Sequence, residues 1–169
     1  MKIRLAKADE LSRLQDIELA AGAPFAEIGM TEVAGHAPPT IETFSGYQQQ
    51  DRAWVQADEN DEPVAFLIAD VVDGAAHIEQ VSVDPAHAGR RLGLGLIEHV
   101  AEWAKAQGFE ALTLTTFTEV AWNGPYYERC GFSFLDESEL TPGLRKIRAA
   151  ETEHGLDQWP RACMRRPID

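Results

Sequence analysis

The spacing of apolar residues along the chain predicts an alternation of helices and strands. Apolar side chains recur every three to four positions in residues 10–20 and again after residue 95, which is the spacing of one helix face. Shorter apolar and β-branched runs between turn residues indicate strands instead. The expected strands are 2–6, 53–57, 63–72, 75–83, 111–117, 132–135 and 161–165. The expected helices are 10–20 with Asp9 as N-cap, 40–48 with Thr40 as N-cap, one ending near 107, 123–130 and 142–153.

The order of these elements predicts an α+β fold. The polar turn at residues 58–62 and the Asp73-Gly74 turn join neighbouring strands as antiparallel hairpins. A strand–helix–strand crossover follows residue 83. We therefore expect a mixed, mostly antiparallel central sheet flanked by helices, within one domain over residues 1–169. Residues 21–40, rich in Gly and Pro, are expected to form an irregular loop or short helices.

A glycine-rich segment lies between an expected strand and the helix that follows it. Gly89, Gly93 and Gly95 carry no Cβ, so the backbone there can approach a ligand closely. The amides from Arg91 to Gly95 are expected to be unpaired donors at a helix N-terminus, where the helix dipole favours an anion. Arg90 and Arg91 add positive charge. The segment therefore predicts a phosphate-binding loop.

Other loops of this kind fit the segment less well. A dinucleotide fingerprint requires a glycine three residues after Gly95, where this chain has Glu98. A P-loop requires Gly-Lys-Ser/Thr, which does not occur. Taken alone, the segment is also compatible with an ordinary glycine-rich turn into an amphipathic helix.

Two motifs together resemble those of the GNAT superfamily of acetyl-CoA-dependent N-acetyltransferases. Arg90-x-x-Gly93-x-Gly95, after Val81-x-Val83-x-Pro85, resembles the acyl-CoA signature Gln/Arg-x-x-Gly-x-Gly/Ala. Tyr126-Tyr127-Glu128-Arg129-Cys130-Gly131-Phe132, preceded by Asn123, is similar to the family's Tyr-x-x-x-Gly-Phe segment. The motifs stand in the family's order, and the resemblance covers roughly residues 1–136. The tail from Glu137, with its extra helix, departs from the simplest core.

The resemblance implies acetyl-CoA as the donor, with its pyrophosphate on the amides of the glycine-rich segment. The backbone of Val81 and Val83 would pair with the pantetheine arm as an added strand does. The sheet would splay between the strands that end at Val83 and Phe117. Asn123 would bind pantetheine or cap its own helix. The expected donor-binding residues are Val81, Val83, Arg90, Arg91, Leu92, Gly93, Leu94, Gly95 and Asn123.

The same resemblance implies two catalytic residues. Tyr127 occupies the general-acid position, where its phenol would protonate the leaving thiolate, although it could instead pack on the donor or the core. Tyr126 is one residue off the family spacing and is expected to point elsewhere. Glu79 shares a strand face with Val81 and Val83 and would take the amine proton through water. The alternative for Glu79 is a surface or salt-bridged carboxylate, and His77 would relay a proton or belong to the edge of the core.

The acceptor is expected to contact the irregular stretch near Phe25, Glu27, Met30 and Thr31, which covers the acceptor pocket in the family. Glu27 would hold a cationic amine or be a solvated loop acid. Trp122 would line the cleft or be buried in the core. The resemblance leaves open a small-molecule amine or a peptide N-terminus as the acceptor. His36 and His87 have no spacing argument, although His87 could touch phosphate.

The amino-acid composition limits the classes of partner and cofactor that we expect. The chain has 28 acidic and 15 basic residues, so a net charge of −13 argues against nucleic acid or an anionic membrane and suits a cationic substrate. No signal-peptide core or membrane-spanning run is visible, and two cysteines predict neither a disulfide scaffold nor a metal site. We therefore expect a cytoplasmic protein without a metal cofactor. A homodimer is a reasonable expectation, because two-fold dimers are the commonest assemblies.

The function expected from these observations is direct acetyl transfer from acetyl-CoA to a primary amine in a ternary complex. No Ser, Cys or Lys has a nucleophile's setting, and Cys130 is interpreted as a structural residue at a helix end. The alternative is a non-catalytic acyl-CoA-binding regulatory module, which would need neither Tyr127 nor Glu79. A nucleotide-binding domain is disfavoured by the missing third glycine.

Overall fold

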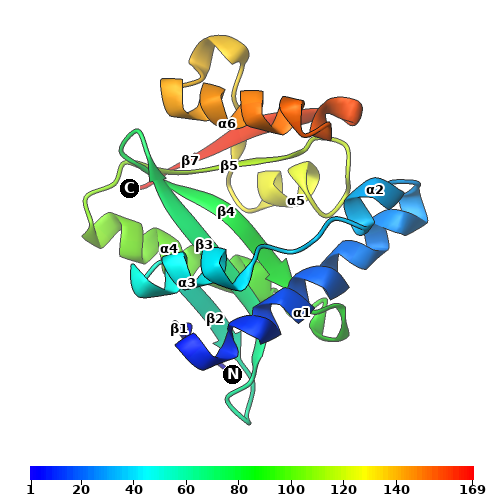
Figure 1. Cartoon of the computed structure of the whole chain (residues 1–169). Helices are drawn as coiled ribbons and strands as arrows, with labels where there is room; N and C mark the ends of the chain where they lie inside the picture. The colour runs from blue at the N-terminus through cyan, green and yellow to red at the C-terminus, as the bar shows by residue number, and fades with distance from the viewer. The chain divides into compact units, whose positions relative to one another are not determined.

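All 169 residues are described by a computed structural model, which contains one seven-stranded sheet (Figure 1). The strands are β1 (Lys2–Leu5), β2 (Ala53–Ala57), β3 (Pro63–Val72), β4 (Ala75–Val83), β5 (Ala111–Phe117), β6 (Ser133–Phe134) and β7 (Arg161–Pro167). The helices are α1 (Leu11–Gly22), α2 (Thr31–Ala34), α3 (Ile41–Gln49), α4 (Leu92–Ala106), α5 (Gly124–Arg129) and α6 (Pro142–Glu153). Short 3₁₀ turns are η1 (Ala8–Glu10), η2 (Ala23–Ile28), η3 (Pro85–His87), η4 (Glu137–Glu139) and η5 (Leu156–Gln158).

The strand order is β1-β2-β3-β4-β5-β7-β6. The pair β4–β5 is parallel, whereas β1–β2, β2–β3, β5–β7 and β6–β7 are antiparallel. The α+β class with a mixed, mostly antiparallel sheet flanked by helices is therefore confirmed. The chain divides into two compact units, Met1–Ala69 with Gln80–Val100 and Asp70–Glu79 with Ala101–Asp169. None of the helices combines the length and apolar character needed to cross a bilayer.

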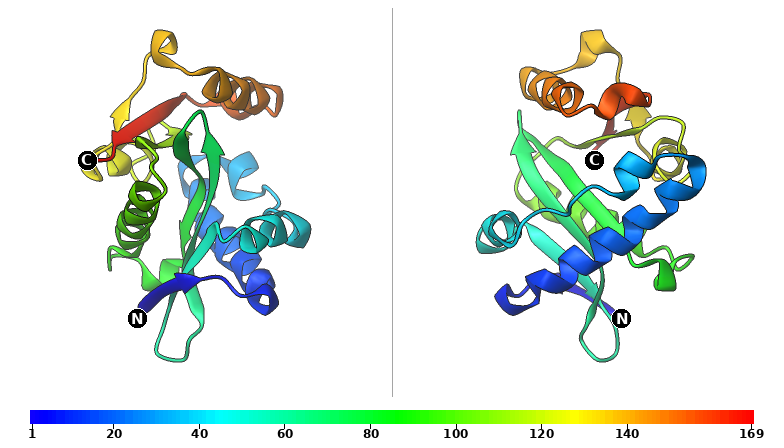
Figure 2. Two further views of the ribbon diagram at one scale, coloured as in Figure 1. Left: turned by 90° about the vertical axis from the view of Figure 1, so that its left-hand side faces the viewer. Right: turned by 45° about the vertical axis from the view of Figure 1, so that its right-hand side comes forward.

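In the first unit, α1 and α3 bury their apolar stripes against β2 and β3, and Figure 2 shows both helices on one face of these strands. Leu14 and Ile17 of α1 are fully buried, as is Phe44 of α3. The ring of Phe44 meets that of Phe66 on β3 edge to face at 5.4 Å. This apolar contact explains why the three-to-four-residue spacing of α1 predicted its buried face correctly.

The two predicted helix caps of this unit have different outcomes. Thr40 caps α3 as expected, because its hydroxyl accepts the Thr43 N–H at 3.1 Å. The prediction of Asp9 as the cap of α1 is wrong, because Asp9 lies inside the η1 turn that precedes α1. Glu10 closes that turn by accepting the Lys7 N–H at 2.7 Å.

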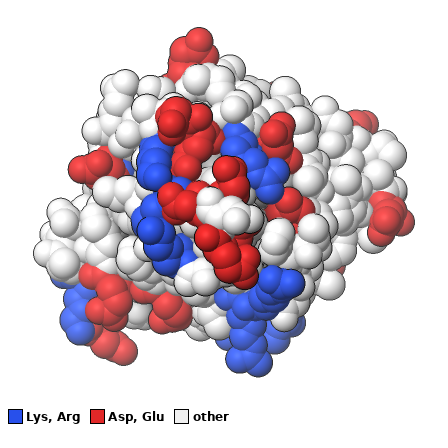
Figure 3. Space-filling model, turned by 90° about the horizontal axis from the view of Figure 1, so that it is seen from below, with Lys and Arg blue, Asp and Glu red and all other residues white.

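One network of ion pairs in the first unit joins β1 and the η1 turn to the loop between β2 and β3. Arg4 lies between Glu10 and Asp61, at 2.8 Å and 2.9 Å, and Lys7 reaches Asp61 at 2.9 Å. Hydrogen bonds from Lys7 and Arg4 lower the pKa of Asp61 to about 2. Figure 3 likewise shows Lys and Arg beside Asp and Glu on the face that it draws. The two acids of this network, Glu10 and Asp61, are therefore compensated by neighbouring bases.

The second unit is built on the long pairing of β5 with β7, which runs from Ala111 opposite Pro167 to Phe117 opposite Arg161. Strand β6 pairs with the other edge of β7. Helix α6 runs along β7 and β5 in Figure 1 and buries Leu144. The segment between β6 and β7, which the sequence pattern separates from the simplest core, thus covers these two strands.

Strands β4 and β5 pair over only two positions, Ala76 with Leu112 and His77 with Thr113. All four of these residues belong to the second unit, whereas Gln80–Val83 of β4 belong to the first. The expected divergence of the sheet between the strands that end at Val83 and Phe117 stays a prediction.

Gly124, the first residue of α5, occupies a position where only glycine fits. A Cβ there would lie 2.9 Å from the Thr118 carbonyl oxygen and 3.1 Å from that of Phe117. Because backbone oxygens cannot turn away as side chains do, we expect Gly124→Ala to lower the free energy of unfolding by about 1–3 kcal/mol. Urea denaturation of the purified variant measures this loss.

Gly46→Ala is the matched control, since Gly46 lies within α3 and a Cβ there meets nothing within 4 Å. It should raise the free energy of unfolding by up to about 1 kcal/mol through helix propensity. Equal changes in the two variants would contradict the steric account of Gly124.

Candidate active site

Strand β4 carries Glu79 and the two valines expected to bind the donor, Val81 and Val83. Its first part, through Glu79, belongs to the second unit, and Val81 and Val83 belong to the first. Both valines are half-buried, as expected of side chains that pack while their backbone could bind a ligand. The pantetheine role of their backbone groups stays a prediction.

The turn after β4 is held by hydrogen bonds to Asp84. The Asp84 N–H donates to the Val64 carbonyl at 2.9 Å, and the Asp84 carboxylate accepts the Ala86 N–H at 3.0 Å. Arg13 of α1 donates to the other carboxylate oxygen at 3.0 Å. The hydrogen bond from the Ala86 amide contributes most to lowering the pKa of Asp84, and the hydrogen bond and charge of Arg13 contribute less. The start of the glycine-rich segment is therefore tied to α1 and β3.

Two residues with left-handed backbone direct the segment into α4. Gly89 has φ +80°, which costs glycine nothing, and Arg91 has φ +58°, which is unfavourable for a residue with a Cβ. Arg90 and Arg91 are exposed and form no ion pair. A strained arginine before a helix N-terminus is typical of a position that function maintains.

The prediction that all amides from Arg91 to Gly95 are unpaired is wrong at its end. Gly95 donates its N–H to the Arg91 carbonyl at 3.0 Å, which is the first regular bond of α4. The helix begins at Leu92, so the amides of Leu92, Gly93 and Leu94 have no acceptor within the helix. The prediction thus extended the free amides one residue too far along the chain.

These features fit a diphosphate anion. The free amides lie at the positive end of a 15-residue helix, and two unpaired arginines lie directly before it. His87 adds a buried Nδ1 atom without a hydrogen-bond partner just ahead of Gly89. An unpartnered buried nitrogen is costly unless a ligand or water satisfies it. The donor set therefore suits the pyrophosphate of an acyl-CoA, although the individual contacts stay predictions.

Glu79, in the second unit, has an unusual electrostatic environment. Burial of its carboxyl group, the negative charges of Asp70 and Glu151, and a hydrogen bond with Asp70 raise its pKa, and Arg161 partly opposes them. The resulting pKa is about 7. The residue as a whole is exposed, so solvent reaches the side chain and partly screens these charges. Such a carboxylate can accept a proton near neutral pH. The exposure of Glu79 agrees with the surface-carboxylate alternative, whereas its raised pKa agrees with the role of a base, which stays a prediction.

His77 belongs to the core, as its second interpretation held. It is 1% exposed, and its Nδ1 shares a hydrogen bond of 2.8 Å with the Thr113 hydroxyl. Burial lowers the pKa of His77, against the opposing charges of Asp70 and Glu151. The imidazole is therefore neutral at physiological pH and orients β4 against β5.

A charged network on α6 and β7 was not predicted from the sequence. Arg148 bonds Glu151 at 2.7 Å and Asp157 at 2.6 Å, and Arg161 bonds Glu151 at 3.1 Å. Arg161 also lies over the Phe117 ring, 4.3 Å from its centroid. The i,i+3 spacing of Arg148 and Glu151 was a visible signal, but nothing local connects them to Arg161. Only the return of the chain along β7 brings the residues together.

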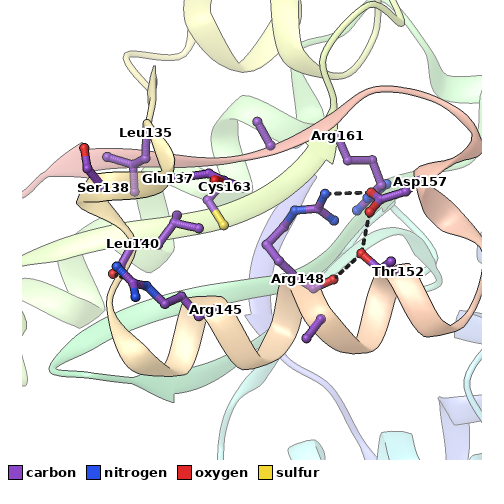
Figure 4. A pocket seen from close by; sticks show the side chains of 12 residues that line it. Leu135, Glu137, Ser138, Leu140, Arg145, Arg148, Thr152, Asp157, Arg161 and Cys163 are labelled. Carbon is purple, nitrogen blue, oxygen red and sulfur yellow. Dashed lines mark hydrogen bonds and ion pairs between the residues drawn. The ribbon is translucent and has the colours of Figure 1, made fainter.

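A hollow of about 590 Å³ lies beside this network, between α6 and β7 (Figure 4). Arg148, Arg161 and Asp157 line one part of it, and Leu135 and Cys163 line another. Two of its arginines, Arg148 and Arg161, bind Glu151 and Asp157. The third, Arg145, donates to the Leu140 carbonyl at 3.2 Å and forms no ion pair.

Tyr127 lies on α5, where its ring meets that of Phe132 edge to face at 6.0 Å. The ring of Tyr126 meets that of Tyr127 edge to face, with 5.3 Å between the ring centroids, and the expectation that its phenol points elsewhere stays a prediction. Consecutive residues on a helix of only six residues diverge by about 100° at the backbone, yet large rings can still lean together. Both rings are half-buried. The acid role of Tyr127 stays a prediction.

Two alternatives around α5 are excluded by the structure. Asn123 occupies the N-cap position, but its side chain makes no capping bond, and only its carbonyl accepts the Tyr127 N–H at 2.9 Å. The capping alternative for Asn123 is thus wrong, and its pantetheine contact stays a prediction. Trp122 is 40% exposed, so its interpretation as a buried core residue is also wrong. The exposure of Trp122 agrees with the other interpretation, in which this side chain lines the cleft.

The expected acceptor region forms η2 and α2 in the first unit. Phe25 is half-buried, and its carbonyl accepts the Met30 N–H at 2.9 Å. Met30 is 3% exposed and belongs to the core. Glu27 and Thr31 are exposed. Their contact with an acceptor stays a prediction.

Two further groups bear on the chemistry. Glu18 of α1 accepts a 2.6 Å bond from the Ser82 hydroxyl on β4, and burial raises its pKa. It is a second carboxyl with raised proton affinity that sequence spacing did not identify.

Cys130 and Cys163 are buried free thiols, and burial is the main reason that the pKa of Cys163 rises to about 11. Cys163 is thus a protonated thiol at neutral pH, unlike an activated nucleophile.

Comparison with known proteins agrees with this geometry. A model of the acetyltransferase (GNAT) family matches residues 21–132. The ribosomal protein bS18-alanine N-acetyltransferase of Escherichia coli strain K12 is 31% identical over 103 residues, which are 60% of this chain and 70% of that protein.

Solved structures share the fold at low sequence identity. A GNAT-family acetyltransferase from Staphylococcus aureus Mu50 superposes with a TM-score of 0.74 at 13% identity, with 99% of each chain covered. The PaiA N-acetyltransferase of Thermoplasma acidophilum, crystallised with coenzyme A, gives a TM-score of 0.71 at 12% identity over 98% of each chain. These similarities show that the arrangement of strands and helices recurs where sequence has diverged.

The raised pKa of Glu79 makes the stability of the protein depend on pH. The pKa is 4.5 for an unperturbed glutamate and about 7 in the folded state, so the native state binds more protons between these values. The stabilisation is complete below the lower value and is lost as pH rises through the higher one. In Glu79→Gln this loss should be absent. Urea denaturation of both proteins from about pH 5 to about pH 8 measures the difference, and parallel profiles would contradict the shift.

Proposed function

The chain belongs to the acetyltransferase (GNAT) family, and on this premise we propose that it transfers the acetyl group of acetyl-CoA directly to the primary amine of a peptide N-terminus. The family match includes the glycine-rich segment and α5 with Tyr127. Membership makes the chain an acetyl-CoA-dependent acetyltransferase. The acceptor and the residue roles are the parts that we propose.

The proposed reaction is one displacement at the thioester carbonyl. The lone pair of the neutral amine attacks the carbonyl carbon, the carbon–sulfur bond breaks, and the sulfur leaves with its electron pair. Glu79 takes the proton released by the amine nitrogen, directly or through a water molecule. Tyr127 gives its phenolic proton to the sulfur. An amide and a free thiol result, and the protons of the two residues are restored by exchange with solvent.

The environment of Glu79 is the observation that carries this proposal. A carboxylate with an ordinary pKa would be a weak base toward an ammonium group, whereas one near 7 matches the working pH. A non-catalytic acyl-CoA-binding module has no need for such a group. The protonated Cys163 thiol gives no support to an acetyl-enzyme intermediate. Direct transfer in a ternary complex is therefore preferred.

The donor is expected to bind through the first turn of α4. The amides of Leu92, Gly93 and Leu94 would hydrogen-bond the pyrophosphate, with Arg90 and Arg91 as its counter-charges. Because Glu79 and the valines of the proposed pantetheine edge lie on one strand, β4, the chain acts in our proposal as a single catalytic domain over residues 1–169.

The E. coli relative supports a peptide acceptor, since its name states that it acetylates an alanine of ribosomal protein bS18. A net charge of −13 also suits a protonated amine that must be captured before it loses its proton. A substrate of this kind would be encountered in the cytoplasm. Small primary amines are the second acceptor class, because the proposed chemistry at the amine is the same.

Tyr127→Phe and Glu79→Gln test the two roles. We expect each variant to lower kcat by roughly a hundredfold or more, because each removes one proton-transfer group. The dissociation constant for acetyl-CoA should stay unchanged. Release of free thiol is measured against a panel of peptides with different N-terminal residues and of small amines. Alanine-initiated peptides are expected to react faster than amines without a peptide bond.

Two neighbouring residues supply matched controls. Tyr126→Phe removes a phenol that contacts the Tyr127 ring, and it should retain activity. Glu18→Gln removes the other carboxyl with a raised pKa and should retain the chemical step. Full activity in Glu79→Gln together with loss in Glu18→Gln would transfer the base role to Glu18. Absence of acetyl-CoA binding by the wild type would contradict the donor site.

A further inference from the structure

Helix α6 presents the carboxylate of Glu151 to strands β5 and β7. Arg148 Nη1 donates to Glu151 Oε1 at 2.7 Å, and Arg161 Nη2 donates to Glu151 Oε2 at 3.1 Å. The hydroxyl of Thr115 on β5 donates to the same Oε2 atom. The Glu151 side chain is only 14% exposed. Its position is therefore determined by partners on three different elements.

The strand register brings this carboxylate close to Glu79. His77 and Thr113 stand opposite each other in the parallel pair of β4 and β5 and share a hydrogen bond. Glu79 and Thr115 each follow two residues later, so each lies on the same face of its strand as that pair. Because Thr115 binds Glu151, the negative charge of Glu151 acts on the carboxyl of Glu79.

We propose that Glu151 is a positioning residue that determines the pH range in which Glu79 accepts the proton of the acceptor amine. This inference rests on the proposed function, in which Glu79 is the base. Helix α6 lies beyond residue 132, where the match to the family model ends. The tail of this chain thus adds a control over a site that the family core supplies.

The groups that face Glu79 determine the sign of the effect. Asp70 of β3 and Glu151 of α6 disfavour its ionisation, and Arg161 of β7 favours it. His77 on its own strand is buried and neutral, so it contributes no charge at neutral pH. Removal of the Glu151 charge favours ionised Glu79 directly, and it also leaves Arg161 without its counter-charge. Both consequences act in the same direction.

A purely structural role of Glu151 predicts a different result. Loss of the bonds to Arg148, Arg161 and Thr115 would lower stability and would lower activity at every pH. It would leave the midpoint of the pH profile in place. The position of the acidic limb of kcat/KM therefore separates the two roles.

The test is the pH dependence of kcat/KM for one alanine-initiated peptide. In Glu151→Gln the acidic limb should move to lower pH by on the order of half a unit, as expected for removal of one partly screened like charge. Glu151→Asp keeps the charge and should restore most of the wild-type profile. Arg161→Gln should move the limb to higher pH. Glu153→Gln, an exposed carboxylate on the same helix, is the matched control and should not move it.

Direct titration of Glu79 separates this inference from the proposed base role. The carboxyl ¹³C resonance of Glu79, assigned with Glu79→Gln, is followed against pH in each variant. A Glu79 pKa that moves while the rate profile does not would support control by Glu151 and remove Glu79 as the base. A Glu79 pKa unchanged in both Glu151→Gln and Arg161→Gln overturns the inference. If Glu151→Gln does not fold, the rise in the Glu79 pKa that we expect in Arg161→Gln decides whether the inference holds.

Discussion

The parallel pairing of β4 with β5 is the constraint on which the environment of Glu79 depends. It places Ala76 opposite Leu112 and His77 opposite Thr113, and the buried His77 shares a 2.8 Å hydrogen bond with the Thr113 hydroxyl. Glu79 and Thr115 follow two residues later on the same faces of their strands, and Thr115 binds Glu151. The carboxyl of Glu79 is therefore influenced by Asp70, Glu151 and Arg161 together.

The neighbouring residues His77 and Glu79 show how one strand holds two different protonation states. Both are affected by burial and by the charges of Asp70 and Glu151. Burial opposes the charged form of each side chain, so it lowers the pKa of the imidazole and raises that of the carboxyl. The acidic neighbours raise both values. For Glu79 the two effects add, whereas for His77 they oppose each other.

Much of the framework could be predicted from local patterns. The strands at 53–57, 63–72, 75–83 and 111–117 have the expected bounds, because hairpin turns and apolar runs act over a few residues. Predictions that required a particular hydrogen bond were less successful. Asp9, Asn123 and Gly95 were each assigned a bond state from residue type and position. Gly95 instead pairs with the Arg91 carbonyl, and neither Asp9 nor Asn123 caps a helix with its side chain.

Residue order alone was sufficient for the family motifs, the fold class and the position of Glu79 on β4, since these follow from spacing along one segment. The environment that raises the pKa of Glu79 required the folded chain. Glu151 and Arg161 are 72 and 82 residues farther along the chain than Glu79. Electrostatic interactions depend on distance through space and on desolvation, and neither can be read from separation along the chain. Only the return of α6 and β7 over the sheet brought these charges to the carboxyl.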